Sequence, residues 1–465
     1  MINRFAGLTL TGLLAMSGTA LEAGQPTQVA GPTFTKDVAP IVFAKCAGCH
    51  RPGEVAPMPL LTYNEVRPWA KAIRGKVIAR EMPPWGADAR WGVFANNASL
   101  TTEQIAAVVA WVDAGAPKGN DADLPPRPSF SAGWVNGTPD YVFEMPKPYA
   151  VPPEGELNPL FFWVPVPFQE DRFARLLEFR PGNRSIVHHG TNHVGDLPKG
   201  ARLDPAGELI FADGTRENGS TPQRRPGGPA NLSLLINYVP GRAALPVHSA
   251  GIAWRIPAGQ HVRFNLHYQP SGRPETDQSR LGVWFSRDRD VQELYKMKVG
   301  TALPTAGDQA QFYHVEGAPA SQREGDWPPL APFAERYTVM GVTPVIEPVT
   351  VYGYAPHMHL RGKAMRWFIT FPDGRTETLL NIPDYDFNWQ FFYELKEPLR
   401  VPAGSTITNV AQYDNSPKNR YNPAPDRPVF WSEQSWDEMY TPSIMYTVDS
   451  EQPKAKHVPK RPGVH

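Results

Sequence analysis

The two cysteines of the chain stand close together and are followed directly by a histidine, in the run Cys46-Ala47-Gly48-Cys49-His50. Cys-x-x-Cys-His is the attachment motif of a c-type haem: the two thiols form thioethers with the haem vinyl groups and the histidine binds the iron. A redox-active dithiol needs no following histidine, and half of a zinc site needs a second pair of ligands nearby. The motif therefore predicts one covalent haem c on Cys46, Cys49 and His50.

A methionine thioether is the expected sixth ligand of the haem iron, because it raises the reduction potential relative to a second histidine. Met82 precedes Pro83 and Pro84, which stiffen an extended segment able to pass along the haem face. Met58 follows His50 after a short stretch and offers a short path to the opposite side of the ring. The pattern favours Met82, and Met58 is the alternative.

His357 and His359 stand at the end of a strand-like run, residues 349–354. Alternate residues of a strand face the same side, so both imidazoles can reach one ion, although a bare His-x-His pattern is a weak signal. Met439 could add a soft thioether, which favours Cu(I) over zinc. The His-x-His pair is therefore one candidate metal site.

His188 and His189 are adjacent, so one ion can bind both only where the backbone kinks, and the following Gly190 would permit a kink. His267 lies on the polar face of an alternating run, residues 261–269, where a surface or hydrogen-bonded histidine is the alternative interpretation. Together the three clusters supply five histidines, enough for two ions.

Helix-forming segments lie on both sides of the haem motif. Thr35 is placed to cap a helix over residues 36–45, which leads into the motif. Thr101 opens a capping box at the start of a second helix, and Gly115 ends that helix. These signals predict a small all-α cytochrome c domain over residues 36–125.

From about residue 140 the chain changes to short alternating runs broken by Pro and Gly, typical of strands. The segments 367–371 and 376–380 flank a Pro-Asp-Gly-Arg turn and predict a hairpin. We expect two all-β sandwich domains, which fit the remaining length of the chain. The predicted divisions after the helices are a linker at 126–139, sandwiches at 140–300 and 301–450, and a disordered tail at 451–465.

Residues 1–23 have the composition of a secretory signal peptide, with Arg4 before an apolar stretch and small residues near Ala23. That stretch is too short to span a bilayer, and no later segment is apolar enough to do so. We therefore expect an exported, periplasmic protein without a membrane span. The 46 basic residues balance the 46 acidic ones, which gives no reason to expect a nucleic-acid partner.

The order of these motifs resembles the copper type II, ascorbate-dependent monooxygenases, the group that contains peptidylglycine and dopamine β-monooxygenases. That order, between about residues 140 and 450, is His-His, Leu-His-Tyr, His-x-His and Asp-Glu-Met. The stretch 412–416, with Asn419 and Asn422, is similar to the bacterial branch in which a cytochrome c domain precedes the monooxygenase. The resemblance implies two tandem jelly-roll-like domains whose coppers face a water-filled cleft.

The resemblance also implies a role for each candidate ligand. It assigns an electron-transfer copper to His188, His189 and His267, and an oxygen-activating copper to His357, His359 and Met439. The expected reaction is hydroxylation of a C–H bond of a small organic substrate with O2, with electrons entering from an external donor through the haem. The alternatives are a haem and copper electron-transfer protein that oxidises no substrate, and a cytochrome on a β scaffold whose histidines are structural.

The chain departs from the family at several positions. Peptide-acting members bind a substrate carboxylate through an arginine before the His-x-His motif and polar residues after the methionine ligand; here Ala355, Thr441 and Ser443 stand there, so a peptidylglycine substrate is not expected. Asn265 stands where some relatives have a glutamine, which leaves its role in electron transfer in doubt. The histidines outside every motif are interpreted as structural or surface residues: His193, His248, His261 and His314.

Overall fold

The computed structural model describes most of the chain. Strands make up 37% of the described residues. The described residues are 31–54, 56–130, 133–155, 157, 159–218, 232–239, 244–246, 251–286, 291, 293–294, 296–298, 311–314, 330–430 and 435–449. The predicted signal peptide, the predicted tail and His248 lie outside these ranges.

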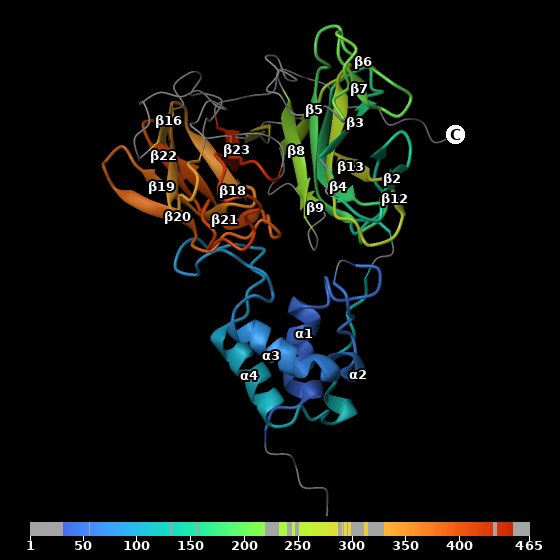
Figure 1. Cartoon of the computed structure of the whole chain (residues 1–465), viewed down its shortest axis with the longest axis vertical. Helices are drawn as coiled ribbons and strands as arrows, with labels where there is room; N and C mark the ends of the chain where they lie inside the picture. The colour runs from blue at the N-terminus through green and yellow to red at the C-terminus, as the bar shows by residue number, and fades with distance from the viewer. Residues whose placement is uncertain are drawn as a thin grey trace, which may run out of the picture.

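The helices are short and gather at one end of the molecule (Figure 1). They are η1 (Phe34–Val38), α1 (Ala39–Lys45), α2 (Tyr63–Val66), η2 (Arg67–Trp69), α3 (Ala70–Ile78), α4 (Thr102–Asp113) and η3 (Asp121–Asp123). Their apolar faces share a small core around the fully buried rings of Phe34 and Trp111. The sequence prediction had no counterpart for α3.

The two predicted helices differ in how well they match. Helix α4 is confirmed: Thr101 and Gln104 form both bonds of the capping box, and Gly115 follows the helix with a φ of 88°. The expected helix over residues 36–45 instead begins as a π-helical turn, η1. The predicted cap is wrong, because Thr33 takes the N-cap position and Thr35 is buried inside the turn.

Two larger sheets follow the helices in the chain. The first has the order β1 (Tyr141–Glu144), β13 (Arg280–Phe285), β4 (Arg172–Arg180), β10 (Ile252–Ile256), β14 (Glu293–Leu294), with β9 (Ala244–Pro246) also on β4. The second has the order β3 (Leu160–Pro165), β11 (His261–Tyr268), β5 (Val187–Gly195), β8 (Ser233–Tyr238). Two small ribbons accompany them: β2 (Tyr149–Val151) with β12 (Glu275–Asp277), and β6 (Arg202–Leu203) with β7 (Leu209–Ile210).

Two more sheets are built mainly from the last third of the chain. The third has the order β15 (Lys296–Lys298), β23 (Thr441–Val448), β18 (Val349–His357), β21 (Tyr393–Val401). The fourth has the order β16 (Gln311–His314), β17 (Tyr337–Pro344), β22 (Thr406–Tyr413), β19 (Gly362–Thr370), β20 (Thr376–Ile382). The predicted hairpin is confirmed as β19 and β20, which are closed where Phe371 N–H donates to Arg375 O.

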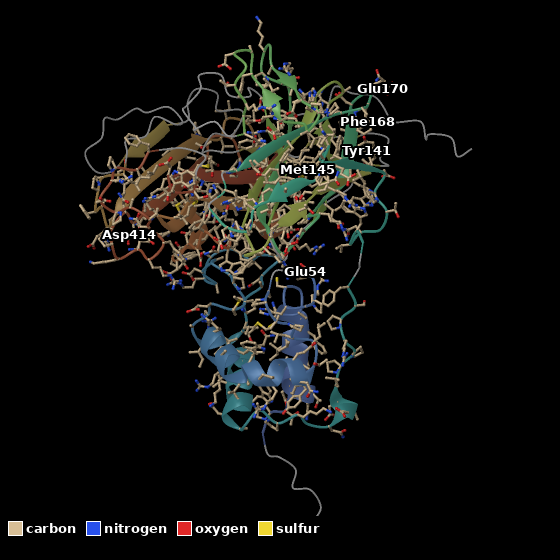
Figure 2. All side chains as sticks on the ribbon, turned by 45° about the vertical axis from the view of Figure 1, so that its right-hand side comes forward. Glu54, Tyr141, Met145, Phe168, Glu170 and Asp414 are labelled. Atoms are coloured by element: carbon tan, nitrogen blue, oxygen red, sulfur yellow. The ribbon has the colours of Figure 1, made fainter. Side chains whose placement is uncertain are left out.

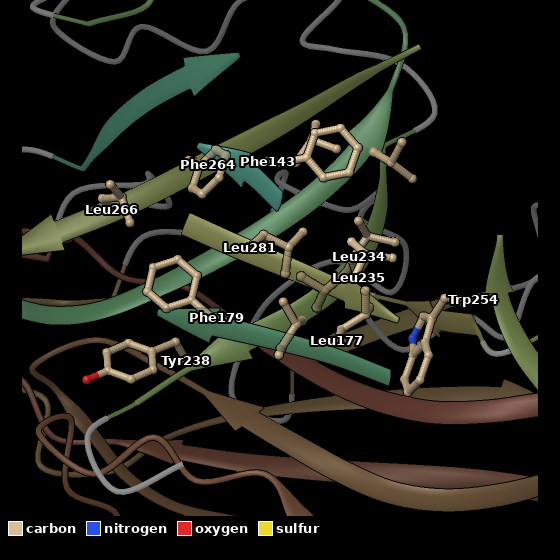
Figure 3. Close-up of a cluster of buried hydrophobic side chains, with 14 of the residues drawn as sticks. Phe143, Leu177, Phe179, Leu234, Leu235, Tyr238, Trp254, Phe264, Leu266 and Leu281 are labelled. Atoms are coloured by element: carbon tan, nitrogen blue, oxygen red, sulfur yellow. The ribbon is translucent and has the colours of Figure 1, made fainter. Parts of the chain in front are cut away.

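The core of the first two sheets continues into the third sheet. Figure 3 shows its centre, where Leu177 and Phe179 from β4 face Phe264 and Leu266 from β11. The same cluster includes Tyr352, Ala355, Phe392 and Met445, which belong to the third sheet or the loop before β21. Every residue of β23 is buried, which is the pattern of a strand covered on both faces.

This continuity shows why the expected fold class is wrong. Two sandwich domains would each bury one core and leave their outer faces to solvent. Here the third sheet contacts a core on each side, and the four larger sheets are arranged like the blades of a propeller rather than as two jelly rolls. The pair β10 and β14 is also parallel.

The all-α cytochrome c domain predicted over residues 36–125 is wrong as well. Between α3 and α4 the chain leaves the helices and packs on the C-terminal sheets, where Trp85 and Phe94 contact Tyr393 at ring distances of 4.8 and 5.6 Å. Pro83 and Pro84 disfavour helix in this segment, and its aromatic rings join the apolar cluster of the C-terminal sheets. None of the described helices is long and apolar enough to cross a membrane.

Candidate metal and haem sites

A β-bulge in β5 brings the two adjacent histidines to one side of the sheet. His267 on β11 pairs with His189, but the next residue, Tyr268, pairs with Val187, so His188 is the extra residue of the bulge. The kink required by the sequence is therefore present, and it comes from the bulge. Gly190 instead leaves room for two neighbouring side chains, because a Cβ there would lie 3.0 Å from the Leu266 side chain and 3.1 Å from the Phe179 ring.

His188, His189 and His267 form the first histidine set. One ring nitrogen from each lies within 4.8 Å of the others. Burial, reinforced by the neighbouring histidines, lowers the pKa of His189 well below 6.5 and that of His267 to about 3, so both rings are neutral and able to bind a metal ion. The buried Nδ1 of His267 has no hydrogen-bond partner among the described residues, as expected of an atom that awaits a ligand.

His357 and His359 form the second histidine set, together with the segment of Met439. The two imidazole rings lie 5.0 Å apart. His357 Nδ1–H donates to Gln390 Oε1 at 2.5 Å, and His359 Nδ1–H donates to Asp437 O at 3.3 Å. Histidine ligands commonly donate one ring N–H to an oxygen in this way, which orients the other nitrogen, here Nε2, toward a metal ion.

The buried carboxylate of Glu438 joins Met439 to this set. Its Oε2 accepts hydrogen bonds from both His359 N–H (2.9 Å) and Met439 N–H (3.1 Å), so the two backbones are neighbours. Burial raises the pKa of Glu438 to about 8, and bonds from Arg361, His359 and Met439 oppose that rise. The structure thus brings the predicted methionine segment beside the predicted His-x-His motif.

Phe387 is the residue that links the two histidine sets, and sequence reasoning missed it. Its ring centroid lies between 5.8 and 6.4 Å from the centroids of all five rings: His188, His189, His267, His357 and His359. The rings of His189 and His357 are themselves only 6.4 Å apart. The two sets therefore lie side by side around one phenyl ring, whereas the resemblance implies two coppers that face a cleft.

The loop that carries Phe387 contacts both sets. Gln390 accepts from His357 and donates to the Phe387 carbonyl at 2.9 Å, while the Asn388 side chain bonds to His188. The only sequence signal for this role is an unusual density of amide and aromatic side chains over residues 385–392. Such a signal does not reveal which histidines the loop reaches.

The cysteine motif follows α1 directly. Cys49 N–H and His50 N–H both donate to the Cys46 carbonyl, which folds the motif into a tight turn with two free, half-buried thiols. Burial raises the pKa of Cys46 to about 12, so the unmodified thiol is protonated. Two thiols beside one imidazole are the donor set that covalent haem requires.

The His50 ring also bears on the choice of sixth ligand. Its Nδ1–H donates to the Met58 carbonyl at 3.1 Å, which leaves Nε2 to bind iron. The Met58 backbone therefore lies beside the His50 ring, and the Met58 side chain packs against the helical core. Met82 is half-buried where the chain leaves α3 for the sheets.

The remaining predicted positions are spread around the site. Ala355 and Ser443 are paired across β18 and β23, and Thr441 Oγ1 donates to the His357 carbonyl at 3.2 Å, so these positions lie beside the second set. Asn265 pairs with Thr191 and Phe161 inside the second sheet. The other described histidines stand away from both sets: His193 on β5, His261 at the start of β11, and His314 on β16.

A surface cavity of about 630 Å³ lies elsewhere, between the segment around Trp91 and the hairpin of β19 and β20. Arg90 and Arg366 line it, together with Glu377. None of the candidate ligands takes part in it, so it does not serve as their substrate pocket.

Comparisons with known proteins give no family for this chain. No family model matches it, and no curated protein does. Among solved structures, allantoicase is similar with 8% identity, a TM-score of 0.15, and coverage of 57% of this chain and 81% of that one. A Paenibacillus xanthan lyase has 10% identity, a TM-score of 0.17, and coverage of 71% and 29%. Scores this low carry no argument about fold or function.

Proposed function

We propose that the protein is an exported, copper-dependent monooxygenase that hydroxylates a C–H bond of a small organic substrate with O2. One observation carries the proposal: five histidines from segments far apart in the chain gather around Phe387, and the Met439 backbone shares the Glu438 carboxylate with that of His359. Structural histidines are usually satisfied singly by local partners, so a convergence of five imidazoles favours metal binding. An external reductant supplies the electrons, and the place of action is the periplasm.

The residues present fit two copper ions. The first set offers three imidazoles, and the second offers two imidazoles with Nε2 available, beside a thioether. Copper bound to such sites cycles between Cu(I) and Cu(II), and a thioether ligand favours Cu(I), the state that reacts with oxygen. Gln390 and the Asp437 carbonyl hold the two imidazoles of the second set in one tautomer, and Glu438 keeps the methionine segment beside them.

The cysteine motif fits covalent haem on Cys46 and Cys49, with His50 Nε2 toward the iron. A haem bound there exchanges single electrons. The Met58 carbonyl orients the His50 ring and the Met58 side chain packs in the helical core, which supports Met82 as the methionine that would supply a thioether to the iron.

A second function has one observation in its favour. Phe387 fills the space among all five histidines, and a ring in that position suits electron transfer without a bound substrate. The alternative is a haem and copper electron-transfer protein.

Oxygen uptake separates the two functions. Copper-loaded, haem-bearing protein is given a reductant and screened against small organic compounds while oxygen consumption and hydroxylated products are measured. Substrate-dependent uptake with one hydroxylated product per O2 supports the monooxygenase. Binding of two coppers and rapid haem oxidation, with no product from any compound, supports the electron-transfer protein. Binding of far fewer than two coppers per chain contradicts both.

A further inference from the structure

The loop of the haem motif is attached to the sheet that carries the first histidine set. The Glu54 side chain, only 5% exposed, accepts a hydrogen bond from Arg184 Nη1 and is paired with Arg51 Nη2 at 2.5 Å. Figure 2 shows Glu54 where the helices meet the sheets. A shielded, doubly paired carboxylate holds two parts of a chain together more firmly than an exposed ion pair does.

Arg184 stands in a rigid turn just before the bulge of β5. Asn183 N–H donates to Asp277 Oδ1 at 2.9 Å, and its side-chain amide donates to Glu275 at 2.8 Å. Ser185 N–H then donates back to Asn183 Oδ1 at 3.1 Å. Because this turn leads directly into Val187 and His188, Glu54 is anchored to the strand that positions the first set.

Tyr238 lies on β8, the neighbour of that strand in the second sheet. It pairs with Gly190, the neighbour of His189, and its ring stacks on Phe179 at 4.9 Å. Figure 3 shows its hydroxyl pointing away from the core cluster. Burial raises the pKa of this hydroxyl, and Glu54 and Cys49 raise it further, whereas the positive charge of Arg184 opposes the rise.

We propose that Glu54, Arg184 and Tyr238 form the contact through which the first histidine set receives electrons, ahead of the second set. The inference rests on the proposed haem and copper sites. A ferrous haem held by Cys46, Cys49 and His50 would give one electron to a cupric ion held by the first set, without transfer of a proton. The Glu54–Arg184 pair ties the loop of the cysteine motif to the turn before β5, and the Tyr238 ring packs beside that strand.

The test is the rate at which reduced haem is reoxidised by bound copper without oxygen, followed by stopped-flow absorbance on the full-length, copper-loaded protein. Arg184→Gln and Tyr238→Leu should slow this step by about tenfold or more, which corresponds to about 1.4 kcal/mol in the barrier. Tyr238→Phe keeps the ring and should stay near the wild-type rate. Arg74→Gln, which breaks the exposed Arg74–Asp113 pair, is the matched control.

Three further measurements keep a structural effect apart from a loss of contact. Haem potential and copper content should equal the wild-type values in every variant, and Arg184→Lys should recover part of the rate if Arg184→Gln folds poorly. If haem reoxidation is equally fast in wild type, Arg184→Gln and Arg184→Lys, the proposed role of the Glu54–Arg184 contact is wrong while the proposed function stands. Wild-type protein that takes up no haem or no copper overturns the proposed function itself, and the contact with it.

Discussion

The imidazole rings of His189 and His357 lie 6.4 Å apart, although one belongs to the second sheet and the other to the third. The apolar contact of those sheets, through Tyr352, Ala355 and Met445, sets this separation. Since both sheets are buried there, neither histidine can move away without exposing apolar surface. Ions bound by the two sets would therefore lie close to each other.

Replacement of His267 by Ala should remove one copper of two. Three imidazoles hold the first ion, and the loss of one leaves a two-ligand site with far weaker binding. Metal analysis after dialysis, with spectroscopy of the cupric protein, measures the change. His261→Ala on the same strand is the control and should retain both ions; a His267→Ala protein that also retains both would remove His267 from the site.

Replacement of Met439 by Ala should abolish oxygen consumption while the haem is still reduced by an external donor. The proposed function assigns the thioether to the second set, and Glu438 holds the surrounding backbone independently of the Met439 side chain. Oxygen uptake and the haem spectrum are recorded on the same sample. Met340→Ala on β17 is a suitable control, and undiminished uptake in the Met439 variant would contradict the assignment.

Replacement of Phe387 by Ala should both destabilise the protein and alter the coppers. A buried phenylalanine contributes about 3 kcal/mol or more to the free energy of unfolding when compared with alanine. The space created would also let water reach all five histidines. Chemical denaturation measures the first effect and the spectrum of bound Cu(II) the second. Phe387→Leu should show a smaller change in both, and identical copper spectra in all three proteins would mean that Phe387 is only a packing residue.

Replacement of Met82 by Ala should change the haem spectrum and lower its reduction potential, because the iron would lose its thioether ligand. Met58→Ala should leave the iron ligation intact, since Met58 contributes its carbonyl to His50 and its side chain to the helical core. Absorbance spectra and potentiometric titration of both variants measure the effect. The reverse outcome would identify Met58 as the ligand.

Stability should fall as the pH is lowered below about 6.5, in part because of His193. Burial, with help from Arg263, lowers the pKa of His193 to about 3 from an ordinary value of 6.5. Between pH 6.5 and pH 3 this histidine is protonated in the unfolded state but not in the folded state. Its contribution to the free energy of unfolding is therefore fully present above pH 6.5 and decreases toward pH 3, by at most about 1.4 kcal/mol per pH unit. Denaturation of wild type and His193→Gln between pH 4 and 8 measures this, and the variant should show the shallower slope.

Features that depend on residues close together in the chain could be predicted from the sequence. The capping box of α4 and the turn of β19 and β20 depend on residues within a few positions of one another, so their side chains decide the outcome. The alternation along β11 likewise predicted which side chains enter the core, and Val262, Phe264 and Leu266 are fully buried. The cysteine motif and the three histidine clusters were evident from spacing alone.

Tertiary structure decided how those pieces meet. Alternating strands do not encode which sheets stack, so the sequence could not show that the third sheet is covered on both faces or that Trp85 and Phe94 join the C-terminal core. The bulge at His188 depends on pairing with β11, and the place of Phe387 depends on a loop reaching two sheets. The residues able to bind metal were determined by the sequence; their arrangement around one phenyl ring follows from long-range burial, which local patterns do not specify.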